Sequence, residues 1–231
     1  MTLKRLSNKD VDAWSAVLAT LAPQCQMPER DSSARKALMA LEEVLSTRRT
    51  IPPDRITPEW LSANLVEALR REAQAHRAIP KIRDSWYNGP PGRIAKKLAE
   101  TAQLKDWISE RAGRRVQDTV NAVYIYYDAA GHHIPLHVDY PEEFEYNLLI
   151  CLDRRSSGTA SATTTMVVTD GEARSIDLAP GQALLFHSSY TPHGRTPLAE
   201  GEAVTLISLG FSPMTHAEPV PSGESGEQEH V

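Results

Sequence analysis

The sequence predicts an α+β protein in which a helical N-terminal segment packs on an antiparallel β-structure. Apolar residues recur at helical spacing in the first half, and short β-type runs fill the second. The charge divides at the same place: residues 1–118 are net basic, whereas residues 119–231 are acidic and contain four Arg and no Lys. We therefore expect a helical segment over 1–118, a β-rich core over 119–213 and a disordered acidic tail over 214–231.

Two stretches of the first half have the apolar spacing of amphipathic helices. The first begins at Asp31 and carries Ala34, Ala37, Leu38, Leu41 and Leu45. The second opens at Thr57-Pro58, a cap residue followed by a proline at the first helical position. A weaker helix is expected over 92–114, and the segment 86–92 before it is typical of a rigid, turn-rich loop.

The second half contains eight short β-type runs separated by turn residues. They cover 119–127, 134–139, 145–152, 163–169, 172–178, 182–187, 191–195 and 203–211. Asp170-Gly171 is a strong hairpin signal, and Pro180-Gly181 is a second turn. Short strands at this spacing predict an antiparallel sandwich or barrel rather than βαβ units.

The composition excludes several classes of protein. A chain of 231 residues with 41% hydrophobic residues can bury a core, and a net charge of −5 argues against a nucleic-acid partner. No run approaches the ~18 apolar residues of a membrane span, and the first fifteen residues lack a signal peptide's apolar stretch. Two cysteines cannot form a disulfide framework, so we expect a reduced, cytoplasmic setting without a membrane partner.

The chemistry is concentrated in His137-Val138-Asp139 and a later histidine. On a strand, residues i and i+2 point to the same face, so His137 and Asp139 can bind one metal ion. A histidine from a neighbouring strand would complete two imidazoles and one carboxylate. That set leaves coordination positions open, as in non-haem Fe(II) oxygenases.

Two segments carry a resemblance to a known family, YYDAAGHHIPLHVDYPEEFEYNLLICLD and APGQALLFHSSYTPHGRTPLAEGEAVTLISLGF. Together they resemble the 2-oxoglutarate/Fe(II) dioxygenase superfamily over residues 119–213, nearest to its prolyl-hydroxylase-like and phytanoyl-type branches. The resemblance implies a double-stranded β-helix, a jelly-roll or cupin-like barrel. It also implies Fe(II), 2-oxoglutarate as cosubstrate and O2, with His137, Asp139 and His193 as metal ligands. His187 is the alternative distal ligand. We prefer His193, because in the family this ligand lies just after the loop, where His193 stands.

The family binds the far carboxylate of 2-oxoglutarate with a basic residue, usually an arginine that opens the last strand. This sequence has Gly201-Glu202-Ala203 there, so the expected arginine is absent. Arg195 is the only basic residue after His193 and would share its strand face, so we predict Arg195 as the anchor. A surface role for Arg195, or an arginine from the basic half, is the alternative. Further candidate cosubstrate contacts are Tyr127, Asn147 and Thr205.

The resemblance implies hydroxylation of a small-molecule substrate with release of succinate and CO2, while desaturation or cyclisation uses the same ligands. The acidic segment 140–145 follows the ligand pair and favours an amine-bearing substrate such as an amino acid. Two other classes remain as alternatives: a cupin-like metal enzyme that does not use 2-oxoglutarate, and a non-catalytic β-barrel scaffold for a partner protein. The sequence leaves the oligomeric state open.

Overall fold

Two antiparallel sheets, packed face to face, form the centre of the protein. The computed structural model describes residues 6–77, 81–83, 86–117, 121–156, 163–170 and 172–214. The larger sheet has the strand order β1-β9-β6-β11-β4-β3-β2, and the smaller has the order β5-β10-β7-β8. The strands of the larger sheet are β1 (Asp54–Ile56), β2 (Lys81–Arg83), β3 (Trp86–Gly89), β4 (Asn121–Tyr127), β6 (Tyr146–Arg155), β9 (Ala183–His187) and β11 (Ala203–Phe211). Those of the smaller sheet are β5 (Ile134–His137), β7 (Thr165–Thr169), β8 (Glu172–Ile176) and β10 (His193–Arg195).

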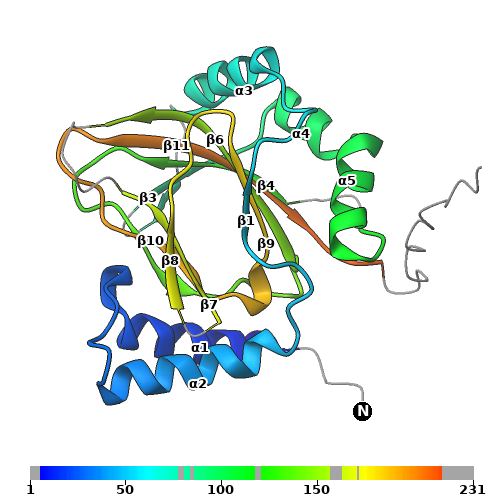
Figure 1. Cartoon of the computed structure of the whole chain (residues 1–231). Coiled ribbons are helices and arrows are strands. Elements are labelled where there is room, and N and C mark those ends of the chain that lie inside the picture. The colour runs from blue at the N-terminus through cyan, green and yellow to red at the C-terminus, as the bar shows by residue number, and fades with distance from the viewer. Residues whose placement is uncertain are drawn as a thin grey trace, which may run out of the picture.

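Helices cover the outer faces of both sheets (Figure 1). Two helices lie against the smaller sheet, α1 (Asn8–Leu21) and α2 (Ser33–Ser46), joined through the 3₁₀ turn η1 (Pro23–Cys25). Three others lie on the side of the larger sheet, α3 (Ala63–His76), α4 (Arg93–Ala99) and α5 (Ala102–Ala112). A short 3₁₀ turn, η2 (Ser188–Tyr190), connects β9 to β10. The order of layers is therefore helices, small sheet, large sheet, helices.

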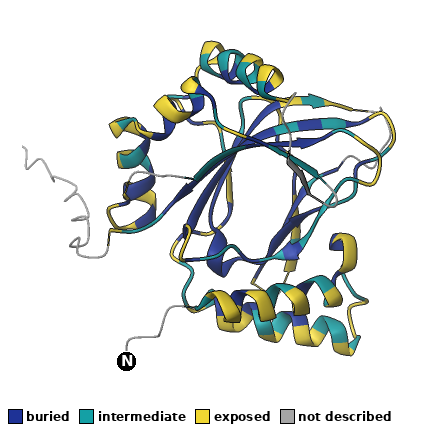
Figure 2. Cartoon of the chain, turned by 180° about the vertical axis from the view of Figure 1, so that it is seen from behind, coloured by how far each residue is buried: buried dark blue, intermediate teal, exposed yellow. Residues whose placement is uncertain are grey.

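Side-chain alternation along the large-sheet strands divides the interior into two cores. On β4, Tyr124 and Tyr126 face α3, whereas Ile125 and Tyr127 face the smaller sheet. A third cluster joins α1 and α2 to the outer face of the smaller sheet and includes Val11, Leu18 and Leu38. The buried strands and the half-exposed helices are visible in Figure 2. The polar residues of the candidate site, described below, lie in the space between the two sheets.

All eight strands predicted for the second half are confirmed, within a few residues at their ends. The predicted hairpin joins β7 to β8, and Asp170 has a left-handed φ of 52°, as a tight two-residue turn requires. The other half of that signal, Gly171, lies outside the described residues. Gly181 has a φ of 84°, so the second predicted turn also needs its glycine.

Three predictions for the first half are wrong. The helix expected from Thr57 begins only at Ala63, where the Ser62 side chain caps it. The residues just before Thr57, 54–56, form the strand β1 at the edge of the large sheet. The expected loop at 86–89 is the strand β3, which pairs with β4. The expected helix over 92–114 is divided into α4 and α5, with a break at Glu100-Thr101.

The first half also contains elements that were not expected. Helix α1 has a capping box, in which the Ser7 side chain accepts from Asp10 N–H and the Asp10 side chain accepts from Ser7 N–H. Strands β1, β2 and β3 extend the large sheet at its two edges, so this half is not purely helical. Among the described residues, no helix combines the length and apolar character needed to cross a bilayer.

Candidate metal centre

His137, Asp139 and His193 converge between the two sheets. Cross-strand register explains the approach, because His193 on β10 lies directly opposite His137 at the end of β5. The two imidazole centroids are 4.3 Å apart. Asp139 follows two residues after His137 on the same side, with its carboxylate oxygens 3.5 Å from His137 Nε2 and 3.6 Å from His193 Nε2. The ligand atoms that the three residues offer lie within 4.8 Å of one another.

Both imidazoles are oriented by the same kind of local hydrogen bond, from Nδ1 to a backbone carbonyl. His137 Nδ1–H donates to the carbonyl of Pro135 at 2.8 Å, and His193 Nδ1–H donates to the carbonyl of Thr191 at 2.9 Å. In each case the acceptor lies two residues earlier in the chain. The bond leaves Nε2 of each ring as the free ligand atom, facing the carboxylate.

The protonation states of His193 and Asp139 also suit a metal ion. Burial, with the neighbouring His137 imidazole, lowers the pKa of His193 to about 4. Burial alone would raise the pKa of the Asp139 carboxyl, but the imidazoles of His193 and His137 outweigh it and hold that pKa well below its usual range. A neutral imidazole beside a carboxylate is the donor set that a divalent metal ion binds.

Two neighbouring segments hold Asp139 in place. Its backbone N–H donates to the carbonyl of Ser188 in η2, at 3.2 Å. Its Oδ2 accepts from Asn147 Nδ2 at 3.3 Å, and Asn147 Oδ1 accepts from Ser208 Oγ at 2.9 Å. Ser208 therefore fixes which end of the Asn147 amide faces the carboxylate.

The strand that carries His193 is supported from behind by the turn η1. Gln24 and Cys25 both have left-handed φ values, 52° and 59°, which place Cys25 against β10. A Cβ at Gly194 would lie only 2.5 Å from Cys25 Sγ, so glycine is required for this close approach. The N-terminal helices are thereby seated directly behind the candidate metal ligands.

A cavity of about 340 Å³ opens beside the three residues, between the two sheets. Besides the triad, its lining mixes polar side chains with apolar ones, the latter including Ile125, Ile134, Leu149 and Leu206. Trp86 and Asn88 of β3 line it from the edge of the large sheet, and Glu143 and Phe144 line it from the segment after Asp139. Arg195 is the single cation among the described lining residues.

Arg195 is buried to 5% exposure on the same strand as His193. Its Nη1 donates to Thr165 Oγ1 at 3.3 Å and its Nη2 to the Thr163 carbonyl at 3.4 Å, while its Nε has no partner in the described chain. The guanidinium carbon lies 4.8 Å from the centre of the Tyr127 ring. None of the ion pairs found among the described residues includes Arg195. Its hydrogen bonds end on neutral oxygens, and the buried Glu202 carboxylate acts on it only from beyond contact distance.

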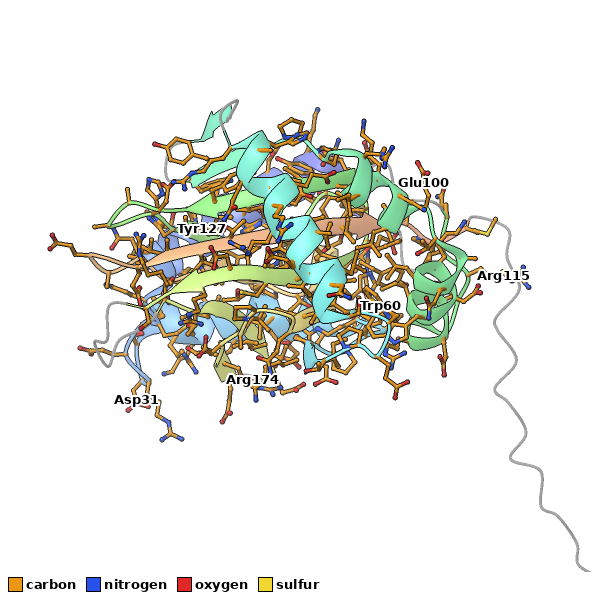
Figure 3. The ribbon with its side chains drawn as sticks, turned by 90° about the horizontal axis from the view of Figure 1, so that it is seen from above. Asp31, Trp60, Glu100, Arg115, Tyr127 and Arg174 are labelled. Atoms are coloured by element: carbon orange, nitrogen blue, oxygen red, sulfur yellow. The ribbon has the colours of Figure 1, made fainter. Side chains whose placement is uncertain are left out.

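The other basic residues of the acidic half have different positions. Arg154 is paired with Asp177, and Arg155 Nε donates to the Gly201 carbonyl. Arg174 is exposed on β8, at the periphery of the molecule (Figure 3). None of these three lines the cavity, and neither does any described basic residue of the first half.

The remaining predicted cosubstrate residues divide between the two faces of the large sheet. Tyr127 and Asn147 line the cavity, and Figure 3 places Tyr127 among the strands. Thr205 does not reach it, because Val204, Leu206 and Ser208 alternate toward the cavity side of β11 and leave Thr205 on the opposite face. Thr205 is therefore not among the residues that line the cavity.

The other histidines of the described residues lie apart from the triad. His187 is buried at the end of β9, where its Nδ1 accepts from Thr50 N–H at 3.1 Å and its Nε2 lies 3.4 Å from Glu145 Oε2. His132 accepts from the Asp128 N–H through Nδ1 and makes an edge-to-face contact with Tyr87. His133 Nδ1–H donates to the Gly131 carbonyl of its own loop at 2.8 Å. Two more, His216 and His230, lie outside the described residues.

Sequence reasoning missed Ser208 and did not single out three other residues that line the cavity. Ser208 is a buried hydroxyl in a hydrophobic strand, and that pattern is the signal that could have found it. Trp86 and Asn88 lie on the same face of β3. The turn residues that follow them made the segment resemble a loop in the sequence. Glu143 was one of three glutamates in an acidic segment, and only the fold distinguishes it from the other two.

Comparison with known proteins identifies the fold. No family model and no curated protein matches the sequence. A prolyl-4-hydroxylase from Pseudomonas putida superposes with a TM-score of 0.58 and 18% identity, over 77% of this chain and 99% of that one. HygX from Streptomyces hygroscopicus, solved with nickel, 2-oxoglutarate and hygromycin B, gives a TM-score of 0.59 and 11% identity, over 81% and 89%.

A third match carries out a different reaction. The epimerase SnoN from nogalamycin biosynthesis, described as non-heme and α-ketoglutarate-dependent, superposes with a TM-score of 0.59 and 16% identity, over 80% of this chain and 87% of that one. The protein therefore shares the fold of solved 2-oxoglutarate/Fe(II) oxygenases. At these identities the likeness establishes the fold, and the reaction has to be argued from the site.

Proposed function

We propose that the protein is an Fe(II)- and 2-oxoglutarate-dependent oxygenase that hydroxylates a small-molecule substrate, and that its two sheets form a double-stranded β-helix. One observation carries the proposal: a His-Asp-His set and a buried arginine without a carboxylate partner line the same cavity. The first is a donor set for Fe(II), and the second is a site for a carboxylate.

His137, Asp139 and His193 would hold the iron. Three protein ligands leave the other coordination positions for 2-oxoglutarate and O2. When bound, the iron with 2-oxoglutarate and O2 would supply the oxidation of a C–H bond, with release of succinate and CO2. The Pro135 and Thr191 carbonyls keep both Nε2 atoms directed at the metal position.

Arg195 would bind the far carboxylate of 2-oxoglutarate. A buried cation whose direct hydrogen bonds are long and end on neutral oxygens has lost its hydration without gaining a contacting counter-charge. A carboxylate that enters the cavity would supply that charge, and the unpartnered Nε provides one donor of a two-pronged contact. The Tyr127 ring lies under the guanidinium and would keep it directed at the cavity. The Tyr127 hydroxyl is a candidate contact for the same carboxylate.

Asn147 has a different role from the one expected. Its amide donates to Asp139 and accepts from Ser208, so both ends already have partners. We assign Asn147 and Ser208 to positioning the carboxylate ligand rather than to direct binding of 2-oxoglutarate.

The position of Arg195 also bears on the alternatives. The absent arginine at the start of the last strand favoured a cupin-like enzyme that does not use 2-oxoglutarate. Arg195 is available in the cavity for the same purpose, which weakens that alternative. A non-catalytic scaffold would not need three metal-type ligands within reach of one another.

Anaerobic titration tests the proposal. Addition of 2-oxoglutarate to the Fe(II)-loaded protein should produce a visible charge-transfer band, which requires chelation of the metal by the keto acid. Asp139→Ala should lose the band, whereas Asp153→Ala, outside the cavity, should retain it. A folded, iron-loaded wild-type protein without the band would refute the use of 2-oxoglutarate.

A further inference from the structure

The cavity has one charged side chain that the proposed reaction does not use. Among its described lining residues, the formally charged ones besides the histidines are Asp139, Arg195 and Glu143. With Asp139 assigned to the metal and Arg195 to the cosubstrate, Glu143 remains as the charge that a substrate would meet. The residual field of the cavity is then negative.

The fold separates Glu143 from the other acidic residues of its segment. Glu142 accepts from Asn8 Nδ2 at 2.8 Å, on the side of α1. Glu145 is buried and faces His187. For the Glu143 carboxylate, neither a hydrogen bond nor an ion pair is found within the described parts of the chain, and it lines the cavity.

The backbone at Glu143 is held in place on the large sheet. Its carbonyl accepts from Ser212 Oγ at 3.3 Å. The next residue, Phe144, packs on Gly210, where a Cβ would fall 2.5 Å from the ring. The carboxylate is therefore presented at the cavity from a fixed point, although the side chain itself is exposed.

A second acceptor lines the cavity from β3. Asn88 Oδ1 is buried and has no hydrogen-bond partner among the described residues. A buried carbonyl oxygen without a donor is unusual, and a ligand that donates an N–H or O–H would satisfy it. Trp86 lies two residues earlier on the same face and offers an aromatic surface, which attracts cations.

We propose that the substrate of this site carries a cationic nitrogen group, recognised by Glu143 at the cavity mouth. This inference rests on the proposed function for the assignments of Asp139 and Arg195. A cationic group with N–H donors suits the Glu143 carboxylate and the residual negative field, whereas an anionic substrate would meet repulsion at Glu143. Glu143 is thus a specificity-determining residue.

A matched pair of probes tests the proposal. n-Propylguanidinium and n-propylurea have nearly the same shape, but only the first is charged; the urea carries a carbonyl oxygen in place of one NH2 group. Calorimetry on the protein loaded with Ni(II) and 2-oxoglutarate should give a Kd at least about fivefold lower for the guanidinium, as expected of a partly exposed ion pair. In Glu143→Gln the two Kd values should become nearly equal.

The control is Glu142→Gln, which removes a neighbouring charge outside the cavity and should retain the wild-type preference. Equal affinities in the wild type, no detectable guanidinium binding, or a preference that survives Glu143→Gln would overturn the proposal. Binding of 2-oxoglutarate is measured separately by the charge-transfer band. A protein that shows the band without guanidinium preference refutes this inference alone, whereas loss of the band refutes the proposed function.

Discussion

The Arg49 guanidinium and the Glu42 carboxylate form a buried ion pair at 2.7 Å, with their side chains 8% and 4% exposed. Arg49 Nε also donates to Thr191 Oγ1 at 3.1 Å, and the Thr191 carbonyl accepts from His193 Nδ1. A helix outside the β-core is thus linked through Arg49 and Thr191 to a candidate metal ligand.

We predict that Glu42→Gln weakens metal binding without touching a ligand. Removal of one partner leaves the Arg49 charge buried and unpaired, which should lower the free energy of unfolding by about 3 kcal/mol. Displacement of Thr191 should reduce Ni(II) affinity by roughly 10-fold or more, as for other partners of metal-bound histidines. Competition with a chelator and urea unfolding measure the two effects. Glu43→Gln, one residue along on the exposed face, is the control, and equal Ni(II) affinity in both variants would contradict the linkage.

Arg195→Ala should raise the 2-oxoglutarate requirement strongly. Loss of the carboxylate partner in a buried site costs roughly 2 kcal/mol or more, so the KM for 2-oxoglutarate should rise at least about 30-fold. Arg195→Lys, which keeps the charge but not the fork, should lie between Ala and wild type. Arg174→Ala on the surface serves as control. An unaltered KM in Arg195→Ala, measured by succinate formation, would mean that the anchor lies elsewhere.

His137→Ala should abolish metal binding and succinate formation, because the triad loses a ligand. His187→Asn should leave most of both, since His187 lies outside the triad and Asn can still accept from Thr50 N–H. The reverse result would make His187 the distal ligand. Isothermal titration with Ni(II) distinguishes the two outcomes before any turnover is measured.

His187 should also contribute a pH dependence to stability. Burial lowers the pKa of its imidazole, so the folded state binds the proton less readily than the unfolded state does. Its contribution is complete above the ordinary histidine pKa of about 6.5 and is lost as the pH falls through the lower folded value. The stability difference between wild type and His187→Asn should therefore shrink from pH 7 to pH 5. Urea unfolding of the metal-free proteins measures it, and a constant difference would contradict the assignment.

Local patterns were sufficient to predict most of the site. His137 and Asp139 are two residues apart on a strand, which alone places them on one face. The choice of His193 over His187 depended on the family resemblance, and the structure supplies its physical basis in the direct register of His193 with His137. Arg195 could be predicted because the acidic half has so few cations.

Tertiary pairing determined what could not be predicted. Asp54–Ile56 is a short segment with two charged residues, and it becomes a strand only because the edge of β9 is available for pairing. Thr205 was placed by its distance from an expected arginine, whereas the alternation of β11 decides which face it occupies. Glu143 and Glu142 are equivalent in the sequence, and only the packing of Phe144 on Gly210 shows which of the segment's carboxylates lines the cavity.

The strand order of the large sheet has a consequence for biosynthesis. The last described strand, β11, lies at the centre of that sheet, between β6 and β4. Until residues 203–211 leave the ribosome, the nascent chain therefore has two half-sheets with unpaired edges where β11 will insert. Such edges are prone to associate with other chains, so translation arrest or truncation shortly before residue 203 should yield aggregates rather than a smaller folded domain.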